Sequence, residues 1–184
     1  MRLMIIVGSV RPGRIGLPIA RWVESVARER DGVDIDFVDL AELALPFMDE
    51  PQHPRLQNYT HSHTLAWSER VAAADAVLLV TPEYNHSYSP ALKNALDYLH
   101  REWWRKPVAF VSYGGVSAGT RAVVALTVVT SGLGMVRTGA AVEINFPAQQ
   151  LQDGVFVPNE KESTILGHVL DELGPLSEAL APLR

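Results

Sequence analysis

Three short segments of the sequence carry residues that could hold a charged or planar ligand. The first segment (residues 8–16, GSVRPGRIG) combines glycine, serine and arginine, and the second (residues 82–85, PEYN) offers a carboxylate, a phenol and an amide. The third (residues 112–115, SYGG) ends in two adjacent glycines. A turn that only reverses the chain needs two to four residues rich in Gly or Pro. The longer run of Tyr, Asn, His and Ser after Pro82 therefore indicates a binding site.

The first segment has the chemistry of a phosphate site. Its glycines allow backbone N–H groups to converge, and the helix expected after it adds the positive end of its dipole. Ser9 contributes a hydroxyl, and Arg11 and Arg14 contribute positive charge. The segment has no G-x-G-x-x-G fingerprint, and Arg14-Ile15 replaces the Lys-Ser/Thr pair of the nucleotide P-loop, so the hydroxyl that binds Mg²⁺ is missing. The alternative is an ordinary turn with two solvated arginines.

The second and third segments suit a flat heterocycle. The rigid Pro82 and the extended backbone beside it can present N–H and C=O groups to the edge of a ring, and Asn85 offers both a donor and an acceptor. Tyr84 adds aromatic surface, although a capped turn with exposed tyrosines is an equal alternative for this segment alone. Gly114 and Gly115 allow the backbone to approach a ligand closely. One phosphate site and two ring-binding loops together describe a mononucleotide site.

The elements that must position these segments alternate regularly along the chain. Short apolar runs predict strands at residues 3–7, 33–40, 76–81, 108–112 and 136–144. Helical spacing predicts helices at residues 15–28, 66–74, 89–101, 118–133 and 160–181, and residues 46–63 read as a long loop. This alternation predicts an α/β fold with a doubly wound parallel sheet of order 2-1-3-4-5. Ligands bind such sheets beyond the carboxyl ends of the strands, where all three segments are expected.

Composition narrows the class of protein. The 184 residues, 47% of them hydrophobic and 20% charged, suit one domain (residues 1–184) with a proper core. The absence of cysteine excludes disulfides and Cys-ligated metals, and no metal is expected. A net charge of −5 disfavours nucleic acid as a partner. No apolar run reaches the ~18 residues that span a membrane, and without a secretion signal a cytoplasmic protein is expected.

The three motifs, in this order, resemble those of the NADPH-dependent FMN reductase family, flavodoxin-like enzymes that include quinone, azo-dye and chromate reductases. The resemblance covers nearly the whole chain, and Pro-Glu-Tyr-Asn is its most specific part. It implies that FMN takes hydride at N5 from NADPH or NADH. The electrons then pass to a quinone-like or other oxidised small molecule, or to free flavin. The flavin carries the chemistry, so no catalytic side chain is required.

The resemblance also implies roles for individual residues. The FMN phosphate would be held by Ser9, Arg11, Ile15 and Gly16. The family often has a Ser-Asn pair in place of Ile15-Gly16, and Arg14 would compensate for it. The isoalloxazine ring would be lined by Pro82, Glu83, Tyr84 and Asn85. Its pyrimidine end would be covered by Ser112, Tyr113, Gly114 and Gly115. Candidates for contacts to the nicotinamide or the acceptor are Arg14, Tyr88 and Arg121.

The resemblance implies a homodimer or homotetramer with its site near the subunit interface. Trp103-Trp104 fits such an interface, and a core pair at a helix end is the alternative. Two other functions are weighed against the enzyme. One is a flavodoxin-like FMN electron carrier without nicotinamide oxidase activity, which would usually have a Thr/Ser-rich phosphate loop and acidic surroundings. The other is an NAD-binding protein that uses Asp39 for a ribose, and the missing G-x-G-x-x-G disfavours it.

Overall fold

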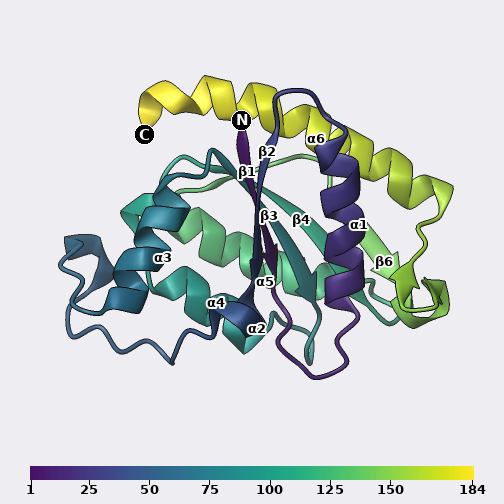
Figure 1. Ribbon diagram of the computed structural model, residues 1–184, viewed down its shortest axis with the longest axis horizontal. Coiled ribbons are helices and arrows are strands. Elements are labelled where there is room, and N and C mark those ends of the chain that lie inside the picture. The colour runs from purple at the N-terminus through teal and green to yellow at the C-terminus, as the bar shows by residue number, and fades with distance from the viewer.

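The computed structural model describes residues 1–184 and contains a parallel sheet as its central layer (Figure 1). Along one path the strand order is β2-β1-β3-β4-β5. These strands are β1 (Arg2–Val7), β2 (Asp34–Asp39), β3 (Ala76–Pro82), β4 (Pro107–Gly114) and β5 (Val136–Arg137). A further strand, β6 (Val142–Asn145), also pairs with β4, and all pairs in this sheet are parallel. The predicted α/β class and the order 2-1-3-4-5 are confirmed.

Helices cover both faces of this sheet (Figure 1). On one face lie α1 (Gly16–Arg28) and α6 (Glu160–Leu180). On the other face lie α3 (Ser62–Ala72), α4 (Pro90–Asp97) and α5 (Thr120–Gly132). Shorter helical turns are α2 (Leu40–Leu43), η1 (Pro54–Leu56), η2 (Arg101–Trp103), η3 (Pro147–Gln150) and η4 (Ala181–Leu183). None of the helices combines the length and the apolar character needed to cross a membrane.

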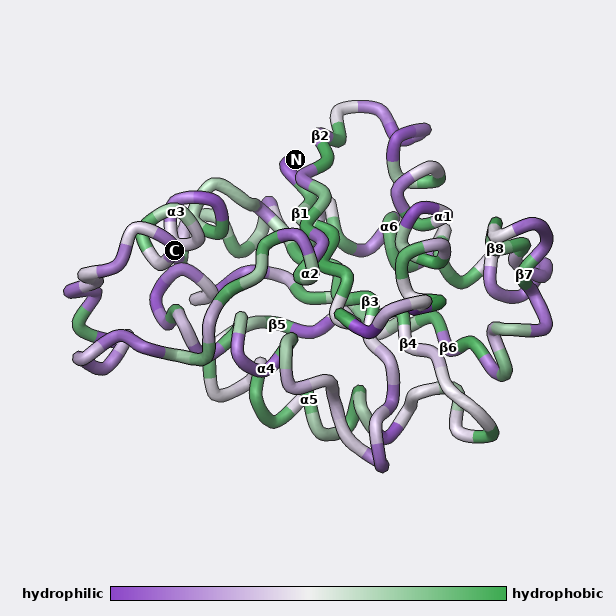
Figure 2. Tube along the Cα trace, turned by 60° about the horizontal axis from the view of Figure 1, so that its bottom comes forward, coloured by the Kyte–Doolittle hydropathy of each residue, from purple (hydrophilic) through white to green (hydrophobic).

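The central strands are apolar at most positions because both of their faces are covered. In β1, Leu3 and Ile5 point to the layer formed with α1 and α6, whereas Met4 and Ile6 point to the opposite layer. Successive side chains of a strand face opposite sides of a sheet, so a strand buried on both faces is largely apolar, and the polar Thr81 and Ser112 lie near the carboxyl ends of β3 and β4. Figure 2 shows the result, with hydrophobic residues along β1, β3 and β4 and hydrophilic ones in the peripheral loops.

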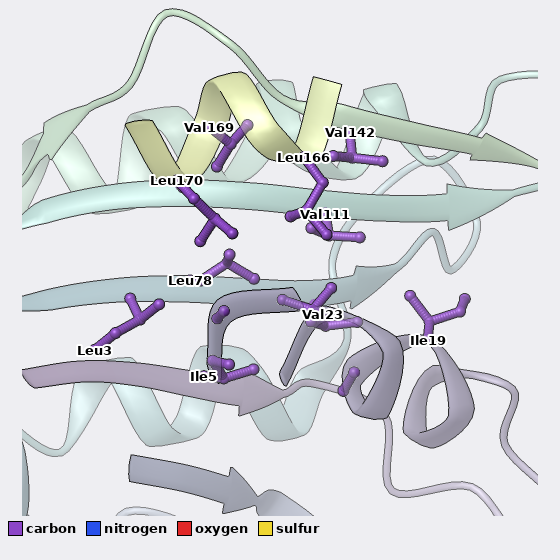
Figure 3. Close-up of a cluster of buried hydrophobic side chains, with 14 of the residues drawn as sticks. Leu3, Ile5, Ile19, Val23, Leu78, Val111, Val142, Leu166, Val169 and Leu170 are labelled. Carbon is purple, nitrogen blue, oxygen red and sulfur yellow. The ribbon is translucent and has the colours of Figure 1, made fainter. Parts of the chain in front are cut away.

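The layer between the sheet, α1 and α6 fixes the helix that begins at the first segment. Figure 3 shows Val23 of α1 near Leu78 of β3, with Ile19 farther along α1 and with Leu166 and Leu170 coming from α6. All but Leu170 are fully buried. Burying each such side chain contributes ~1.5–3 kcal/mol relative to leaving it exposed. This packing holds the first turn of α1 in a fixed position against the sheet edge.

The strand predicted at residues 136–144 is wrong as a continuous element. It consists of β5 and β6, with residues 138–141 between them. Within this break, the Oγ1 of Thr138 donates to the carbonyl of Ala140 (2.9 Å), and Glu172 of α6 accepts the N–H of Gly139 (2.7 Å). The partner that stabilises the break therefore comes from a helix far along the chain, and the local pattern could not reveal it.

Other element ends also differ from the predictions. α3 begins at Ser62 rather than residue 66. The prediction missed its first turn because that turn is polar and only Thr64 in it is buried. α4 ends at Asp97 rather than residue 101, and α5 begins at Thr120 rather than residue 118. A small hairpin of β7 (Leu151–Gln152) and β8 (Val155–Phe156) was not predicted. Its turn is Asp153-Gly154, with both φ angles positive, a known hairpin signal that strands of two residues obscured.

Candidate functional site

The three segments meet at the carboxyl ends of β1, β3 and β4. The hydroxyls of Ser9 and Tyr84 lie 2.7 Å apart, which joins the first segment to the second. The backbone N–H of Glu83 donates to the carbonyl of Tyr113 (3.1 Å), which joins the second segment to the third. They converge because β1, β3 and β4 are neighbours and parallel, so their carboxyl-end loops share one sheet edge.

A cavity of about 180 Å³ lies where the first segment leads into α1. Its lining consists of Ser9, Arg11, Pro12, Gly13, Arg14, Ile15, Pro82, Tyr84 and Tyr113. Pockets for drug-sized ligands occupy ~300–1,000 Å³, so this cavity suits a small group rather than a whole ring. A helix start offers unpaired N–H groups to an anion. A larger cavity of about 490 Å³, between α1 and β8, includes none of the predicted site residues.

The two arginines of the first segment differ in their surroundings. The guanidinium of Arg14 forms an ion pair with Asp39 at the end of β2. Asp39 is only 5% exposed, and it also accepts the N–H of Ala41 at the start of α2 (3.0 Å). Arg11 is exposed and forms none of the ion pairs of the protein. Arg14 therefore anchors the segment to β2, while Arg11 remains available to an anion.

The side chain of Tyr113 extends from β4 to the first turn of α1. A Cβ atom on Gly16 would overlap its hydroxyl, so the two positions depend on each other. Tyr113 is 7% exposed, and its hydroxyl is buried without a hydrogen-bond partner. Burial raises the pKa of this phenol above its ordinary value, so it keeps its proton at neutral pH. A buried donor without a partner costs ~1–3 kcal/mol, which points to a ligand atom that completes it.

Glu83 holds the second segment to the start of α5. Its carboxylate accepts the hydroxyl of Ser117 (2.8 Å), the guanidinium of Arg121 (3.0 Å) and the N–H of Arg121 (3.2 Å). Burial alone would raise the pKa of the Glu83 carboxyl, but the hydrogen bonds from Ser117 and Arg121 hold that pKa below its ordinary value. A carboxylate that accepts an N–H group at the start of a helix, as Glu83 does at α5, is also favoured by the helix dipole. The Glu83 side chain thus positions the loop after β4.

The polar run after Pro82 forms a tight turn followed by a helix cap. The N–H and C=O groups of Tyr84 and Ser87 bond reciprocally (2.8 and 2.9 Å), and Asn85 and His86 between them have φ angles of 48° and 69°. Positive φ at both central positions is typical of a type I′ turn. Both of these side chains are exposed. Ser89 caps α4 through the N–H of Leu92 (3.2 Å), as its place before Pro90 predicts.

The third segment is held mainly through its backbone. Ser112 is fully buried, and its hydroxyl donates to the carbonyl of Ala118 (2.9 Å), so its side chain supports the loop. Sequence reasoning missed Asn145 at the end of β6, whose amide donates to the carbonyl of Val116 (2.8 Å). An asparagine at the carboxyl end of a strand was the available signal, and the unpredicted break before β6 hid it. Gly115 is exposed, and a Cβ there would meet only Phe146, at 3.8 Å.

The comparisons with known proteins agree with this geometry. Residues 1–148 match the protein family described as NADPH-dependent FMN reductase. The chain belongs to this family. An NAD(P)H-dependent FMN reductase of Schizosaccharomyces pombe is 36% identical to this chain over 179 residues, which cover 96% of this chain and 89% of the relative. A 2-hydroxy-1,4-benzoquinone reductase of a Burkholderia species is 32% identical over 126 residues, which cover 65% of this chain and 64% of the relative.

Among solved structures, the flavoenzyme NAD(P)H:(acceptor) oxidoreductase FerB of Paracoccus denitrificans is similar over 97% of this chain and 98% of its own. The TM-score is 0.78 and the sequence identity is 25%. The flavodoxin-like fold and the family membership predicted from the sequence are confirmed. The chain is therefore an oxidoreductase that uses FMN with NAD(P)H as co-substrate.

The donor set at the sheet edge fits a flavin mononucleotide. The small polar cavity, with the unpaired guanidinium of Arg11 and the partnerless hydroxyl of Tyr113, matches a phosphate ester. The exposed turn at Asn85 and the exposed backbone at Gly115 belong to the neighbouring loops, where a ring could lie without displacing core side chains. Charged donors bond phosphate oxygens more strongly than neutral ones.

Proposed function

We propose that FMN binds across the three segments and that this FMN reductase passes electrons from NAD(P)H to a quinone-like small molecule. The observation that carries the proposal is the cavity at the first segment, which combines a helix start, Ser9 and Arg11 beside two loops with open backbone. The Burkholderia relative, whose name specifies a benzoquinone, supports the acceptor class. When bound, FMN supplies the hydride-accepting chemistry, and the protein supplies orientation and electrostatics.

Each part of the site has a separate task in this proposal. Ser9, Arg11 and the N–H groups around Ile15 and Gly16 hold the phosphate, which orients the rest of the cofactor. The backbone from Pro82 to Asn85 lines one edge of the ring, and Glu83 fixes that backbone to α5. The backbone of residues 112–115 covers the pyrimidine end. One face of the ring stays open to the nicotinamide, with Tyr88 and Arg121 near the opening.

The surroundings of the site favour the enzyme over an electron carrier. An FMN electron carrier would be strongly acidic around the flavin, but here Arg11, Arg14 and Arg121 lie in or beside the three segments. Asp39 balances the charge of Arg14 and Glu83 balances that of Arg121, so with the unpaired Arg11 these surroundings are not strongly acidic. The reading in which Asp39 binds a ribose loses support, because that carboxylate is engaged by Arg14 and by the N–H of Ala41.

An anaerobic titration of the purified FMN-loaded protein tests the proposal. We expect NADPH or NADH to bleach the visible absorbance of the bound flavin, and added 1,4-benzoquinone to restore it. A protein whose FMN stays oxidised in excess of both nicotinamides would instead be an electron carrier. Bleaching that oxygen reverses but benzoquinone does not would contradict the acceptor class.

We also propose that the whole chain, residues 1–184, acts as one FMN-binding domain within a cytoplasmic homodimer or homotetramer. The two tryptophans named above separate in the structure. Trp103 is fully buried, and its indole N–H donates to the carbonyl of Leu96 (3.1 Å), whereas Trp104 is 43% exposed. The interface argument therefore rests on Trp104 and on the exposed Val124 and Val128 of α5. Light scattering should show at least twice the 20.2 kDa chain mass, and a monomer would contradict it.

A further inference from the structure

Two buried side-chain atoms at the cavity have no hydrogen-bond partner, the Nε of Arg14 and the hydroxyl of Tyr113. The Arg14 guanidinium is already engaged through its ion pair with Asp39. The Tyr113 hydroxyl has no partner in hydrogen-bonding geometry, although it lies close enough to the Ser9 hydroxyl for Ser9 to lower the pKa that burial raises. We propose that this hydroxyl donates a hydrogen bond to the FMN phosphate, and that residue 16 is glycine in order to leave room for it. The inference rests on the proposed FMN site, and it moves the Tyr113 side chain from the ring to the phosphate.

The backbone gives no other reason for glycine at position 16. Gly16 is the first residue of α1, and it is absent from the glycines with a positive φ angle. Residues other than glycine could adopt its conformation, and glycine is a poorer helix former than alanine. What a side chain would meet is Tyr113: a Cβ would overlap the hydroxyl, and the ring atoms Cζ and Cε1 would lie at 3.1 and 3.4 Å.

The hydroxyls that line the cavity differ in what they can still donate. Those of Ser9 and Tyr84 bond each other, so one of their two hydrogens is already used. The Tyr113 hydroxyl retains its hydrogen, and burial keeps the phenol protonated. A fully ionised phosphate monoester has acceptor oxygens and no donor, so a phenol that keeps its proton can donate to it. Tyr113 at the end of β4 would thus supply a side-chain donor to the phosphate, which Gly16 at the start of α1 cannot do.

The first test is the Tyr113→Phe variant, which removes one oxygen atom and keeps the ring. Affinities for FMN and riboflavin are measured by quenching of flavin fluorescence on the apoprotein. Hydrogen bonds to charged groups correspond to roughly 10- to 100-fold in affinity. We expect a loss of this size for FMN and an unchanged affinity for riboflavin, which lacks the phosphate. We also expect the thermal midpoint of the apoprotein to rise, because the variant no longer buries an unpaired hydroxyl.

The matched control is Tyr59→Phe. The Tyr59 hydroxyl donates to Glu102 (2.9 Å) and lines no part of the cavity. Losing this satisfied bond should lower the thermal midpoint and leave the ratio of FMN to riboflavin affinity unchanged. The two tyrosines should therefore respond with opposite signs in stability, which a merely structural role for Tyr113 would not produce.

The second test is Gly16→Ala, made alone and together with Tyr113→Phe. Alone, the added Cβ displaces the Tyr113 hydroxyl, so FMN affinity and the thermal midpoint should both fall. In the Tyr113→Phe background the nearest atom is the ring carbon at 3.1 Å, so the same change should cost less. Strictly additive effects would show that the two positions are independent and would overturn the inference.

The outcomes separate this inference from the proposed site. Equal losses of FMN and riboflavin in Tyr113→Phe would place the hydroxyl at the ring, and an unchanged FMN affinity would remove it from the site. A wild-type protein that binds neither flavin would contradict the proposed function instead. In that case inorganic phosphate serves as the probe: stabilisation of the wild type but not of Tyr113→Phe would still support the hydroxyl as a phosphate ligand, and equal stabilisation would overturn it.

Discussion

The two ends of the sheet satisfy their polar groups in different ways. At the amino ends of the strands, Lys106 is 4% exposed and donates to the carbonyls of Ala72 (3.2 Å) and Ala74 at the end of α3. Near it, Arg184 donates to the carbonyl of Asp75 (2.7 Å). We call Lys106, Asp75 and Arg184 the amino-end cluster, and each of its charged groups has a partner. At the carboxyl ends, the Tyr113 hydroxyl has none.

This difference shows which buried polar groups are hydrogen-bonded within the protein and which have a donor available for a ligand. An unpaired buried polar group costs ~1–3 kcal/mol, and native structures tolerate few of them. The amino-end cluster leaves none, so it needs no ligand to complete its hydrogen bonds. The cavity at the first segment keeps an unpaired hydroxyl beside an unpaired arginine, and both can be satisfied by an anion.

The largest expected effect is a loss of stability, and it is tested by replacing one glycine at each end of the sheet. Gly119 before α5 and Gly32 before β2 both have positive φ angles (84° and 71°), so alanine strains either position. At Gly119 a Cβ would also lie 2.6 Å from the backbone nitrogen of Tyr113, whereas at Gly32 it would meet nothing within 4 Å. Gly119→Ala should lower the free energy of unfolding by about 3 kcal/mol, the sum of strain and overpacking. Gly32→Ala should cost only about 1 kcal/mol.

Urea denaturation of the two glycine variants measures this difference. Equal losses would show that the loop before α5 is no more tightly packed than the loop before β2. They would remove one basis for a preorganised site at the carboxyl ends.

The next effect concerns the unpaired arginine. Arg11→Ala should weaken FMN binding by ~1.5–3 kcal/mol, the range for hydrogen bonds to charged groups, and should leave riboflavin binding nearly unchanged. Arg14→Ala is the matched control, because it leaves the buried carboxylate of Asp39 without its cation and should lower stability. Isothermal titration with both flavins measures the difference. Equal losses of FMN and riboflavin in Arg11→Ala would contradict a phosphate role for the first segment.

The ring-binding loops can be tested without disturbing the fold. Gly115 has space for a side chain in the protein itself, so Gly115→Val should keep the far-UV circular dichroism of the wild type. Its flavin content and NADPH oxidation should fall together, because the valine occupies the place where the backbone approaches the ring. Asn85→Ala should cost only ~0.5–1.5 kcal/mol, the value of an amide hydrogen bond. If Gly115→Val kept its full flavin content and unchanged NADPH oxidation, this loop would not contact the flavin and would be only a turn.

A pH-dependent effect tests the amino-end cluster. Burial, with the nearby charge of Arg184, lowers the pKa of Lys106 to about 8, whereas an unfolded lysine titrates near ~10.4. Between these pH values the unfolded chain binds more protons, so stability should rise with pH by at most ~1.4 kcal/mol per unit. Lys106→Met should lack this rise between pH 8 and 10 in urea denaturation. A wild-type profile as flat as that of the variant would contradict the lowered pKa.

The strand order and the meeting of the three segments could be predicted because both follow from local patterns. Apolar runs mark buried strands, and the order 2-1-3-4-5 then brings the loops after β1, β3 and β4 to one edge. The N-cap at Ser89 is likewise local, and the structure has it.

What could not be predicted depends on partners far apart in the sequence. The ion pair of Arg14 with Asp39 commits an arginine that the sequence alone assigns to a phosphate. The direction of Tyr113 depends on the absent side chain of Gly16 on another element. The break between β5 and β6 depends on Glu172. In each case the residue type was evident, but its partner was set by packing across the sheet.

A crystal structure of this FMN reductase with FMN bound tests the central claim most directly. The account predicts the phosphate in the cavity lined by Ser9 and Arg11, with the ring extending beside Asn85 and Gly115. A phosphate bound outside that cavity, or a ring that fills it, would contradict the account.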